Sequence, residues 1–156
     1  MNEDHETKTK VLVTHAATVA VTSRDSSCEF YPQLRRTARF HMWDFFATVA
    51  SVWVAYSQID EDVEMSLRRS TKTTVQNALD EFHPSAFGAL KDLDNLVLRI
   101  LSREPDITKR PTHTPLAVGT WFVWNLTNKQ PIQDEPQIAG FLGRVVVQMI
   151  NGYWRV

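Results

Sequence analysis

Hydrophobic residues are concentrated in one stretch between Phe40 and Ile59, which reads FHMWDFFATVASVWVAYSQI. Its only charged residue is Asp44, so a helix formed by this segment is apolar on every face. Such a helix would expose a large hydrophobic area on any protein surface, and we therefore expect other elements to surround it. We predict that this helix runs over residues 33–58 and begins after Pro32, since proline is well tolerated at a helix start.

Three later segments also carry helical signals. The acidic residues at 60–64 are typical of a first helical turn, where carboxylates meet the positive end of the helix dipole, and they predict a helix as far as Phe82. Pro84 ends that helix and opens a third one, in which apolar residues recur every three or four positions up to Leu101. The same spacing is strongest over residues 138–150, which we predict to be the last helix.

Two segments leave the choice between strand and helix open. Residues 11–22 are rich in β-branched side chains and their valines alternate with period two, which favours a strand or short hairpin over a buried helix. Residues 115–126 begin after a threonine suited to cap a short helix, but Gly119 weakens that interpretation and a strand is the alternative. The polar segments 103–114 and 128–135 predict loops.

We therefore predict a mainly α fold, a single-domain bundle of about five helices around the hydrophobic central helix. A short β element at the N-terminal end is compatible with this pattern, and an α+β fold is the alternative. The polar residues 1–10 predict a disordered tail. Residues 11–156 then form one domain, because a chain of 156 residues is long enough to build one hydrophobic core.

The composition narrows the choice of compartment and partners. A net charge of −1 offers no general attraction for a polyanion, so extensive nucleic-acid binding is not expected. The apolar run 45–59 is shorter than the roughly 20 residues that a membrane-spanning helix needs, so we expect no membrane partner. Cys28 is the only cysteine and cannot form an intramolecular disulfide, which favours the reducing cytoplasm.

Three arginines, Arg35, Arg36 and Arg39, lie near the N-terminal end of the predicted central helix. Positive charge at this end opposes the helix dipole by about 0.3–1 kcal/mol per exposed residue, so a compensating negative charge is expected. It could come from Asp or Glu side chains of another element, or from an acidic partner or a phosphate group. These arginines are therefore candidate binding residues.

Arg36 and His41 have four residues between them. This spacing resembles the Arg-x4–6-His motif of the HEPN class, helical bundles that often cleave RNA. The resemblance implies a ribonuclease in which His41 takes part in proton transfer at a ribose hydroxyl while Arg36 stabilises phosphate charge. We keep this catalytic pair as an alternative interpretation.

Tryptophans supply a further candidate site, formed by Trp43, Trp53, Trp121 and Trp124. Indoles most often fill a core, because each buries a large area and needs only one polar partner. They can also form an association surface. A third interpretation is a pocket for an apolar or cationic ligand, with Asp44 as the counter-charge.

No spacing of chemistry-bearing residues indicates a metal, a cofactor or a catalytic apparatus of another kind. The histidines show no HExxH motif, and the few glycines form no phosphate-binding or dinucleotide-binding loop. We predict a non-enzymatic interaction protein that forms a homodimer or larger homo-oligomer through its aromatic-rich helices and binds a protein or a small apolar ligand. The alternatives are a HEPN-like ribonuclease and a small-ligand sensor with a tryptophan-lined pocket.

Overall fold

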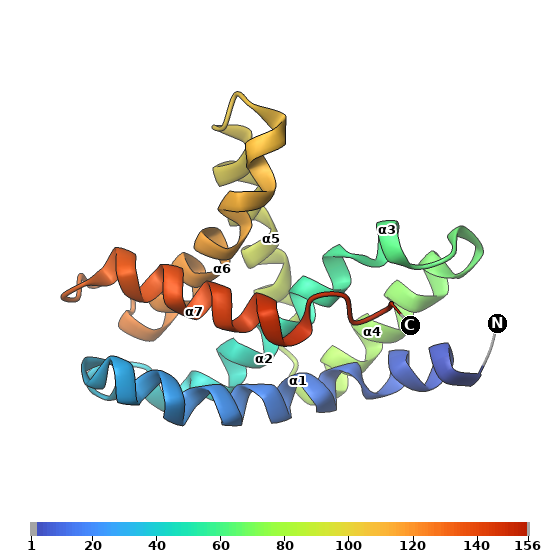
Figure 1. Ribbon diagram of the computed structural model, residues 1–156. Helices are drawn as coiled ribbons and strands as arrows, with labels where there is room; N and C mark the ends of the chain where they lie inside the picture. Colours follow the sequence, from blue (N-terminus) through green and yellow to red (C-terminus); the bar gives the residue numbers. More distant parts are fainter. Residues whose placement is uncertain (1–2, 156) are drawn as a thin grey trace.

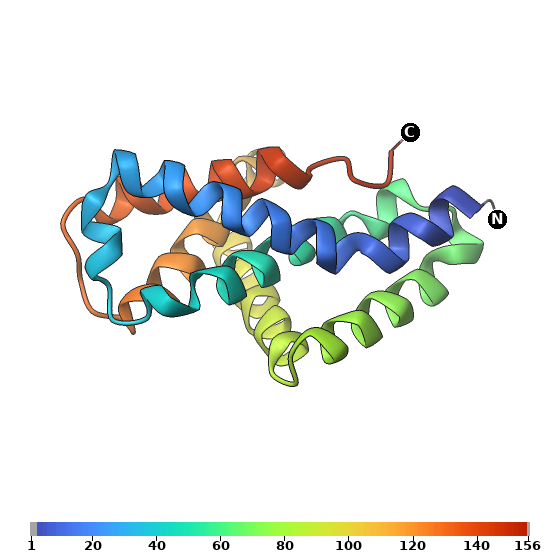
Figure 2. The ribbon, with the colours of Figure 1, turned by 90° about the horizontal axis from the view of Figure 1, so that it is seen from below.

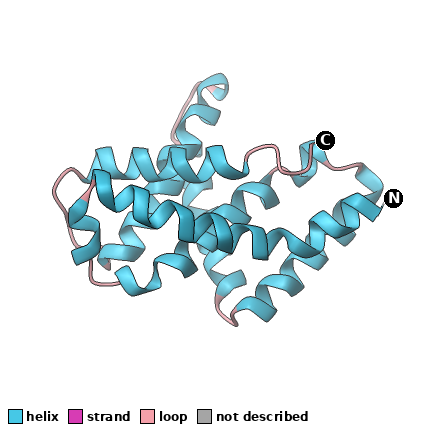
Figure 3. Cartoon of the chain, turned by 60° about the horizontal axis from the view of Figure 1, so that its bottom comes forward, coloured by secondary structure: helices cyan, strands magenta, loops and turns pink. Residues whose placement is uncertain are grey.

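A computed structural model describes residues 3–155, and every regular element in this range is helical (Figure 3). The α-helices of this range are α1 (Glu3–Phe30), α2 (Trp43–Ser57), α3 (Ile59–Asp62), α4 (Arg68–Phe82), α5 (Ala86–Ser102), α6 (Arg110–Thr127) and α7 (Glu135–Ile150). Short 3₁₀ turns lie at Pro32–Arg36, Phe40–Met42, Met65–Leu67 and Ile107–Lys109. The predicted mainly α fold is confirmed, and no β element occurs between residues 3 and 155.

Helix α2 is the centre of the bundle. It packs against α1, α5, α6 and α7, and every residue from Phe46 to Ala55 is buried. The prediction that other elements surround this helix is confirmed, because its uniformly apolar surface has no face suited to water.

Some of the other helices form a layer beside α2, and the outer end of one helical hairpin projects from the bundle. Helices α1 and α7 run alongside each other, and the C-terminal part of α6 lies against α7 (Figure 1). The end of α5 and the beginning of α6 form a hairpin that rises away from these helices. Seen from below, α4 meets α1 near the N-terminus and diverges from it toward α5 (Figure 2). The outer end of the hairpin, Leu98–Thr114, is called the arm below.

Helix α1 differs most from the sequence-based expectation. It is one continuous helix of 28 residues. The predicted strand or hairpin at 11–22 is therefore wrong, and residues 3–10, for which the sequence predicts disorder, belong to this helix. Residues 1–2 of the predicted tail lie outside the described part of the chain.

The burial pattern of α1 explains this difference. Leu12, Ala16 and Ala20 are buried at intervals of four and face the core, whereas Val11 and Val21 from the period-two pattern are exposed. The small side chains on the buried face allow α2 to pack closely against α1. This tertiary packing outweighs the preference of valine for strands, which depends strongly on context.

The central helix begins at Trp43 rather than at residue 33. The preceding chain forms two 3₁₀ turns separated by Thr37, whose backbone is extended. The Thr37 hydroxyl donates to the Leu34 carbonyl at 2.7 Å, and the Arg39 N–H donates to the Leu126 carbonyl of α6 at 2.8 Å. Because these bonds replace a continuous helical ladder, the arginine cluster lies before α2 and not in its first turn.

The predicted helix from 60 to 82 is also interrupted. Helix α3 ends at Asp62, and Val63 is extended with its side chain buried in the core. The chain resumes as α4 at Arg68, whose Nε donates to the Val63 carbonyl at 2.9 Å. The helix is therefore interrupted at Val63, because the extended backbone there places the Val63 side chain in the core.

Residues 115–126, for which the sequence left the choice between strand and helix open, form part of helix α6. It begins at Arg110, with Pro111 in its first turn, so the predicted loop 103–114 is shorter than expected. Val118, Trp121 and Phe122 are buried at helical spacing, and the strand alternative is wrong.

Helices α6 and α7 approach each other very closely. A Cβ added at Gly119 would overlap the carbonyl of Ala139, and one added at Gly143 would overlap the carbonyl of Pro115. Each glycine thus faces the backbone of the opposite helix, an approach that only a residue without a side chain permits. The predicted last helix is confirmed in α7.

The C-terminal segment continues beyond α7 toward the N-terminal end of α1 (Figure 1). The buried Trp154 donates its indole N–H to the Ala55 carbonyl of α2 at 2.7 Å, and the Tyr153 hydroxyl donates to the Lys8 carbonyl of α1 at 2.7 Å. Among the helices described between residues 3 and 155, none combines the length and the hydropathy that a membrane crossing requires.

Candidate functional site

The tryptophans of the candidate site do not share one pocket. Trp43 is buried against aromatic rings of α6 and of the preceding 3₁₀ turn, and it lines none of the hollows described here. Trp53 lines one hollow of the surface, and Trp121 and Trp124 line another. Three of the four indoles are thus mainly core residues, while Trp124 remains 38% exposed.

Two aspartates of α5 hold indoles on opposite sides of that helix. Trp53 donates its Nε1–H to Asp94 at 3.0 Å, and Trp121 donates to Asp92 at 3.0 Å. Residues two apart on a helix point about 200° apart, so α5 separates the two hollows. Sequence reasoning missed both aspartates, although an Asp-Leu-Asp sequence in the middle of an amphipathic helix was a usable signal.

The first hollow, which we call the notch, lies between the arm and the ends of α2, α3 and α7. Its volume is about 580 Å³. Its lining residues are mainly apolar and include Trp53, Val54, Val97, Leu98, Leu101, Ile107, Pro111, Pro115 and Val147. Leu98 is 58% exposed and Ile107 is 70% exposed. The arm thus contributes two large, exposed aliphatic side chains to its own side of the notch.

Charge differs between the two walls of the notch. The arm carries four basic residues, Arg99, Arg103, Lys109 and Arg110, and two acidic ones, Glu104 and Asp106. On the opposite wall, α3 contributes the acidic side chain of Glu61, whereas its neighbours Asp60 and Asp62 form ion pairs with Lys72 at 2.8 Å and with Arg155 at 3.3 Å. Glu61 itself lines the notch and has no ion-pair partner among residues 3–155.

The two acids of the arm are used within it. The Glu104 carboxylate accepts the Asp106 N–H at 3.1 Å and lies 3.0 Å from His113 Nε2. The hydrogen bond from the Asp106 backbone, followed by that from His113, lowers the pKa of Glu104 below its usual value. Hydrogen bonds from Thr108 likewise lower the pKa of Asp106. Its basic side chains therefore dominate the outward charge of the arm.

The second hollow, which we call the basic hollow, lies on the other side of α5 and has a volume of about 110 Å³. Three cationic residues from separate elements line it: Arg39, Arg99 and Lys129. Trp121 and Trp124 supply its aromatic wall. Arg39 was a sequence-based candidate, whereas Arg99 and Lys129 were not, because only the tertiary structure brings these segments together.

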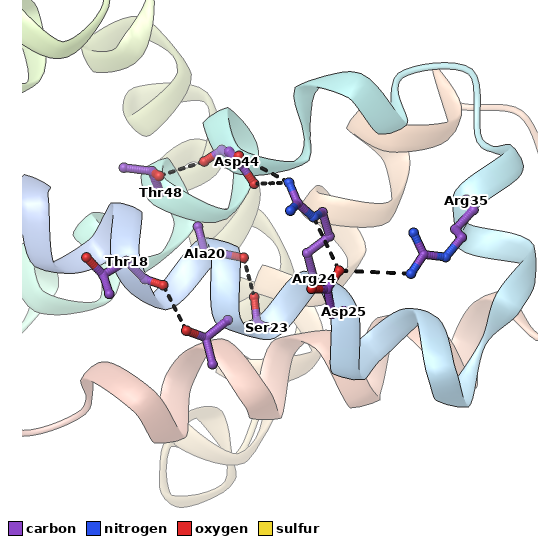
Figure 4. A network of polar contacts seen from close by, with 9 residues as sticks. Thr18, Ala20, Ser23, Arg24, Asp25, Arg35, Asp44 and Thr48 are labelled. Carbon is purple, nitrogen blue, oxygen red and sulfur yellow. Dashed lines mark hydrogen bonds and ion pairs between the residues drawn. The ribbon is translucent and has the colours of Figure 1, made fainter.

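Asp44 and Arg35 belong to a surface network at the C-terminal end of α1 (Figure 4). Arg24 donates to both carboxylate oxygens of Asp44 at 3.2 and 3.3 Å, and Arg35 lies 3.9 Å from Asp25. Asp44 thus pairs with an arginine of α1 and lines neither the notch nor the basic hollow. Arg35 obtains its compensating negative charge from a neighbouring element, one of the two sources expected from the sequence.

Arg36 and His41 lie in different 3₁₀ turns, with Thr37 extended between them. Both side chains are exposed. Neither residue lines the notch or the basic hollow. No contact of the described residues joins this pair into a site, and no observation favours the ribonuclease alternative.

Cys28 is buried, and burial raises the pKa of its thiol, which disfavours the reactive thiolate. Within residues 3–155, no three His, Cys, Asp or Glu side chains gather in an arrangement that could hold a metal ion. The features best suited to function are therefore the notch and the basic hollow. Comparisons with family models, with curated proteins and with solved structures find no match for this chain.

Proposed function

We propose that this chain is a non-enzymatic binding protein of the cytoplasm that forms a homodimer by placing the arm of each copy in the notch of the other. One observation carries the proposal: Leu98 and Ile107, which are 58% and 70% exposed, form the arm side of an apolar notch of about 580 Å³. Large aliphatic side chains grouped on a surface are typical of interaction sites.

The aromatic-rich central helix cannot provide this contact, because α2 is enclosed by its own monomer. The arm differs from α2 in that it projects from the bundle (Figure 1). The arm and the notch are complementary surfaces on the same chain. In a two-fold symmetric dimer each arm would fill the notch of the other copy, so the assembly is closed and no arm or notch is left to bind a third copy. We therefore assign the self-association contact to the arm and not to the aromatic-rich helices.

Charge complementarity supports a second copy as the occupant. The arm has an excess of two positive charges, four bases against two acids, and three of these bases, Arg103, Lys109 and Arg110, lie outside the basic hollow. The far wall of the notch carries Glu61, which has no ion-pair partner among residues 3–155. In a two-fold arrangement the basic arm of one copy meets Glu61 of the other. Such complementarity favours encounter and fixes orientation.

Sedimentation velocity tests the proposal. The wild-type protein is expected to sediment as a dimer at tens of micromolar, and the double variant Leu98→Asp/Ile107→Asp as a monomer, because each aspartate would be buried in an apolar contact. Val21→Asp is the matched control, since Val21 is an exposed valine of α1 outside the notch and should leave the dimer intact. A wild-type protein that is monomeric in this range contradicts the proposal.

A charge exchange tests the orientation of the two copies. Arg103→Glu or Glu61→Lys alone should weaken dimerisation, by roughly two- to fivefold for each exposed pair. The combined variant should recover wild-type affinity, because the two changed side chains again carry opposite charges across the interface. Strictly additive losses in the combined variant would show that arm and notch do not meet.

A further inference from the structure

We propose that the basic hollow binds a small organic phosphate that carries a planar ring, with the phosphoryl group between Arg39, Arg99 and Lys129 and the ring against Trp124. Helix α5 separates this hollow from the notch, although Arg99 also belongs to the arm. All residues that line the hollow come from one copy of the chain, so the proposal does not require a dimer.

The three cations have no internal neutralising partner. None of them forms an ion pair within the described residues 3–155. They come from three separate segments, the turn before α2, helix α5 and the loop after α6, yet they line one hollow of about 110 Å³. A convergence of unpaired cations is favourable where an anion binds between them.

The backbone holds two of these residues in place. The Arg39 N–H donates to the Leu126 carbonyl at 2.8 Å, and the Lys129 N–H donates to the Trp124 carbonyl at 2.8 Å. Both segments are thus fixed to the last turn of α6. Because the backbone is anchored, binding an anion requires ordering of the side chains alone.

The acidic residue of the hollow does not neutralise this group. Asp92 is the lining carboxylate, and its Oδ2 accepts the indole N–H of Trp121 at 3.0 Å. The lining therefore keeps an excess of two positive charges, three cations against one carboxylate. This excess matches a phosphate monoester, which carries nearly two negative charges at neutral pH. Two of the cations are arginines, whose planar donors suit phosphate oxygens.

The aromatic wall of the hollow indicates the second part of the proposed ligand, a planar ring. Trp124 is 38% exposed and lines the hollow, so part of its indole is open to a partner. The hollow has the volume for a phosphoryl group but not for a nucleoside as well, and a ring attached to that phosphate must lie at its rim. Stacking on an exposed indole stabilises a planar ring in that position.

Isothermal titration calorimetry with adenosine monophosphate, inorganic phosphate and adenosine tests this inference. Adenosine monophosphate should bind more tightly than inorganic phosphate, by about five- to a hundredfold if its ring stacks on Trp124. Adenosine should bind most weakly, because it lacks the charged group. Absence of heat from adenosine monophosphate and from phosphate at millimolar concentration would overturn the proposal.

Variants separate the two parts of the site. Arg99→Gln and Lys129→Gln, both at exposed residues, should each weaken binding of both phosphates by about tenfold or more. Arg69→Gln in α4 is the matched control and should bind as the wild type. Trp124→Leu should remove the advantage of adenosine monophosphate over phosphate while leaving phosphate affinity within about twofold. Wild-type affinity in Arg99→Gln and Lys129→Gln would show that the cations of the hollow hold no phosphate.

Discussion

At the scale of single residues, α2 contains two buried hydroxyls in contrasting states. Ser51 Oγ is buried and has no hydrogen-bond partner in the described part of the chain, whereas Thr48 Oγ1 donates to the Asp44 carbonyl at 2.6 Å. Burying a polar group without a partner costs free energy, while a satisfied group contributes to stability. The two residues therefore allow a matched test of polar burial within one helix.

We expect Ser51→Ala to raise the free energy of unfolding by about 0.5–1 kcal/mol, because it removes an unsatisfied hydroxyl and introduces a better helix former. Thr48→Val keeps the shape but loses the hydrogen bond, and should lower the free energy of unfolding by about 1 kcal/mol. Urea unfolding followed by circular dichroism measures both changes. Equal and destabilising effects of the two substitutions would show that Ser51 has a partner.

Only some residues of the basic hollow could be predicted from the sequence. Trp121, Trp124 and Arg39 were recognised by their chemistry alone. Arg99 and Lys129 look like ordinary surface cations in the sequence. The packing of α5 against α6 and the bond from Arg39 to Leu126 bring the three cationic segments together. Hollows formed by distant segments cannot be predicted from local patterns.

At the scale of elements, apolar spacing predicted α5 and α7 well because each has one buried face. It failed for α1, where Val11 and Val21 suggested a strand although the buried face consists of Leu12 and of the small residues Ala16 and Ala20. Pro32, interpreted as a helix start, placed the beginning of α2 too early, since the Thr37 hydroxyl and the Arg39 N–H bond outside a helical ladder. Periodicity reports which side chains are buried, and helix ends depend on competing polar bonds.

The contact between α6 and α7 gives a prediction for that pair of helices. Gly119→Ala or Gly143→Ala places a methyl group on the backbone of the facing helix, so the helices must separate. We expect a loss of at least about 2 kcal/mol in unfolding free energy, in the range found for overpacked cores. Thermal or urea unfolding measures this loss.

Gly88→Ala is the control for these substitutions. Gly88 lies inside α5 with open space around the position of an added Cβ. Alanine there should raise the free energy of unfolding by up to about 1 kcal/mol, because alanine favours a helix more than glycine does. If all three variants lost stability equally, close approach of α6 and α7 would not be the cause.

The arm is the element with a predicted response to pH. Glu104 and Asp106 have pKa values below their ordinary values of 4.5 and 3.8 because the folded arm donates hydrogen bonds to their carboxylates. The folded arm therefore binds protons less readily than the unfolded one. Its stabilisation is fully present above pH 4.5 and is lost as the pH falls through the lowered values.

An NMR titration checks this response. Amide signals of residues 104–108 should shift, as the pH falls below 3.8, before those of α2 do. In Glu104→Gln the Asp106 amide should lose the part of its response that comes from Glu104, because the side chain that accepts its N–H no longer titrates, and should keep the part that comes from its own carboxyl group. Simultaneous change in the arm and in α2 would mean that the arm has no separate acid transition.

At the scale of the whole molecule, the C-terminal segment connects the two ends of the chain. Trp154 donates to the Ala55 carbonyl of α2, Tyr153 donates to the Lys8 carbonyl of α1, and Lys8 donates back to the Tyr153 carbonyl at 3.3 Å. The last residues of the chain thus fasten the first helix to the central one. The stability of α1 should therefore depend on this distant segment.

We expect Trp154→Ala to lower the free energy of unfolding by about 3–5 kcal/mol, because it removes a buried indole and leaves a cavity between α1 and α2. Trp124→Ala, which removes the same side chain from a site that is 38% exposed, should cost roughly 1–2 kcal/mol. Hydrogen exchange in Trp154→Ala should also increase in the first turns of α1, because their support is lost. Exchange that rises uniformly along the chain, or equal losses in the two variants, would mean that the C-terminal segment does not fasten α1.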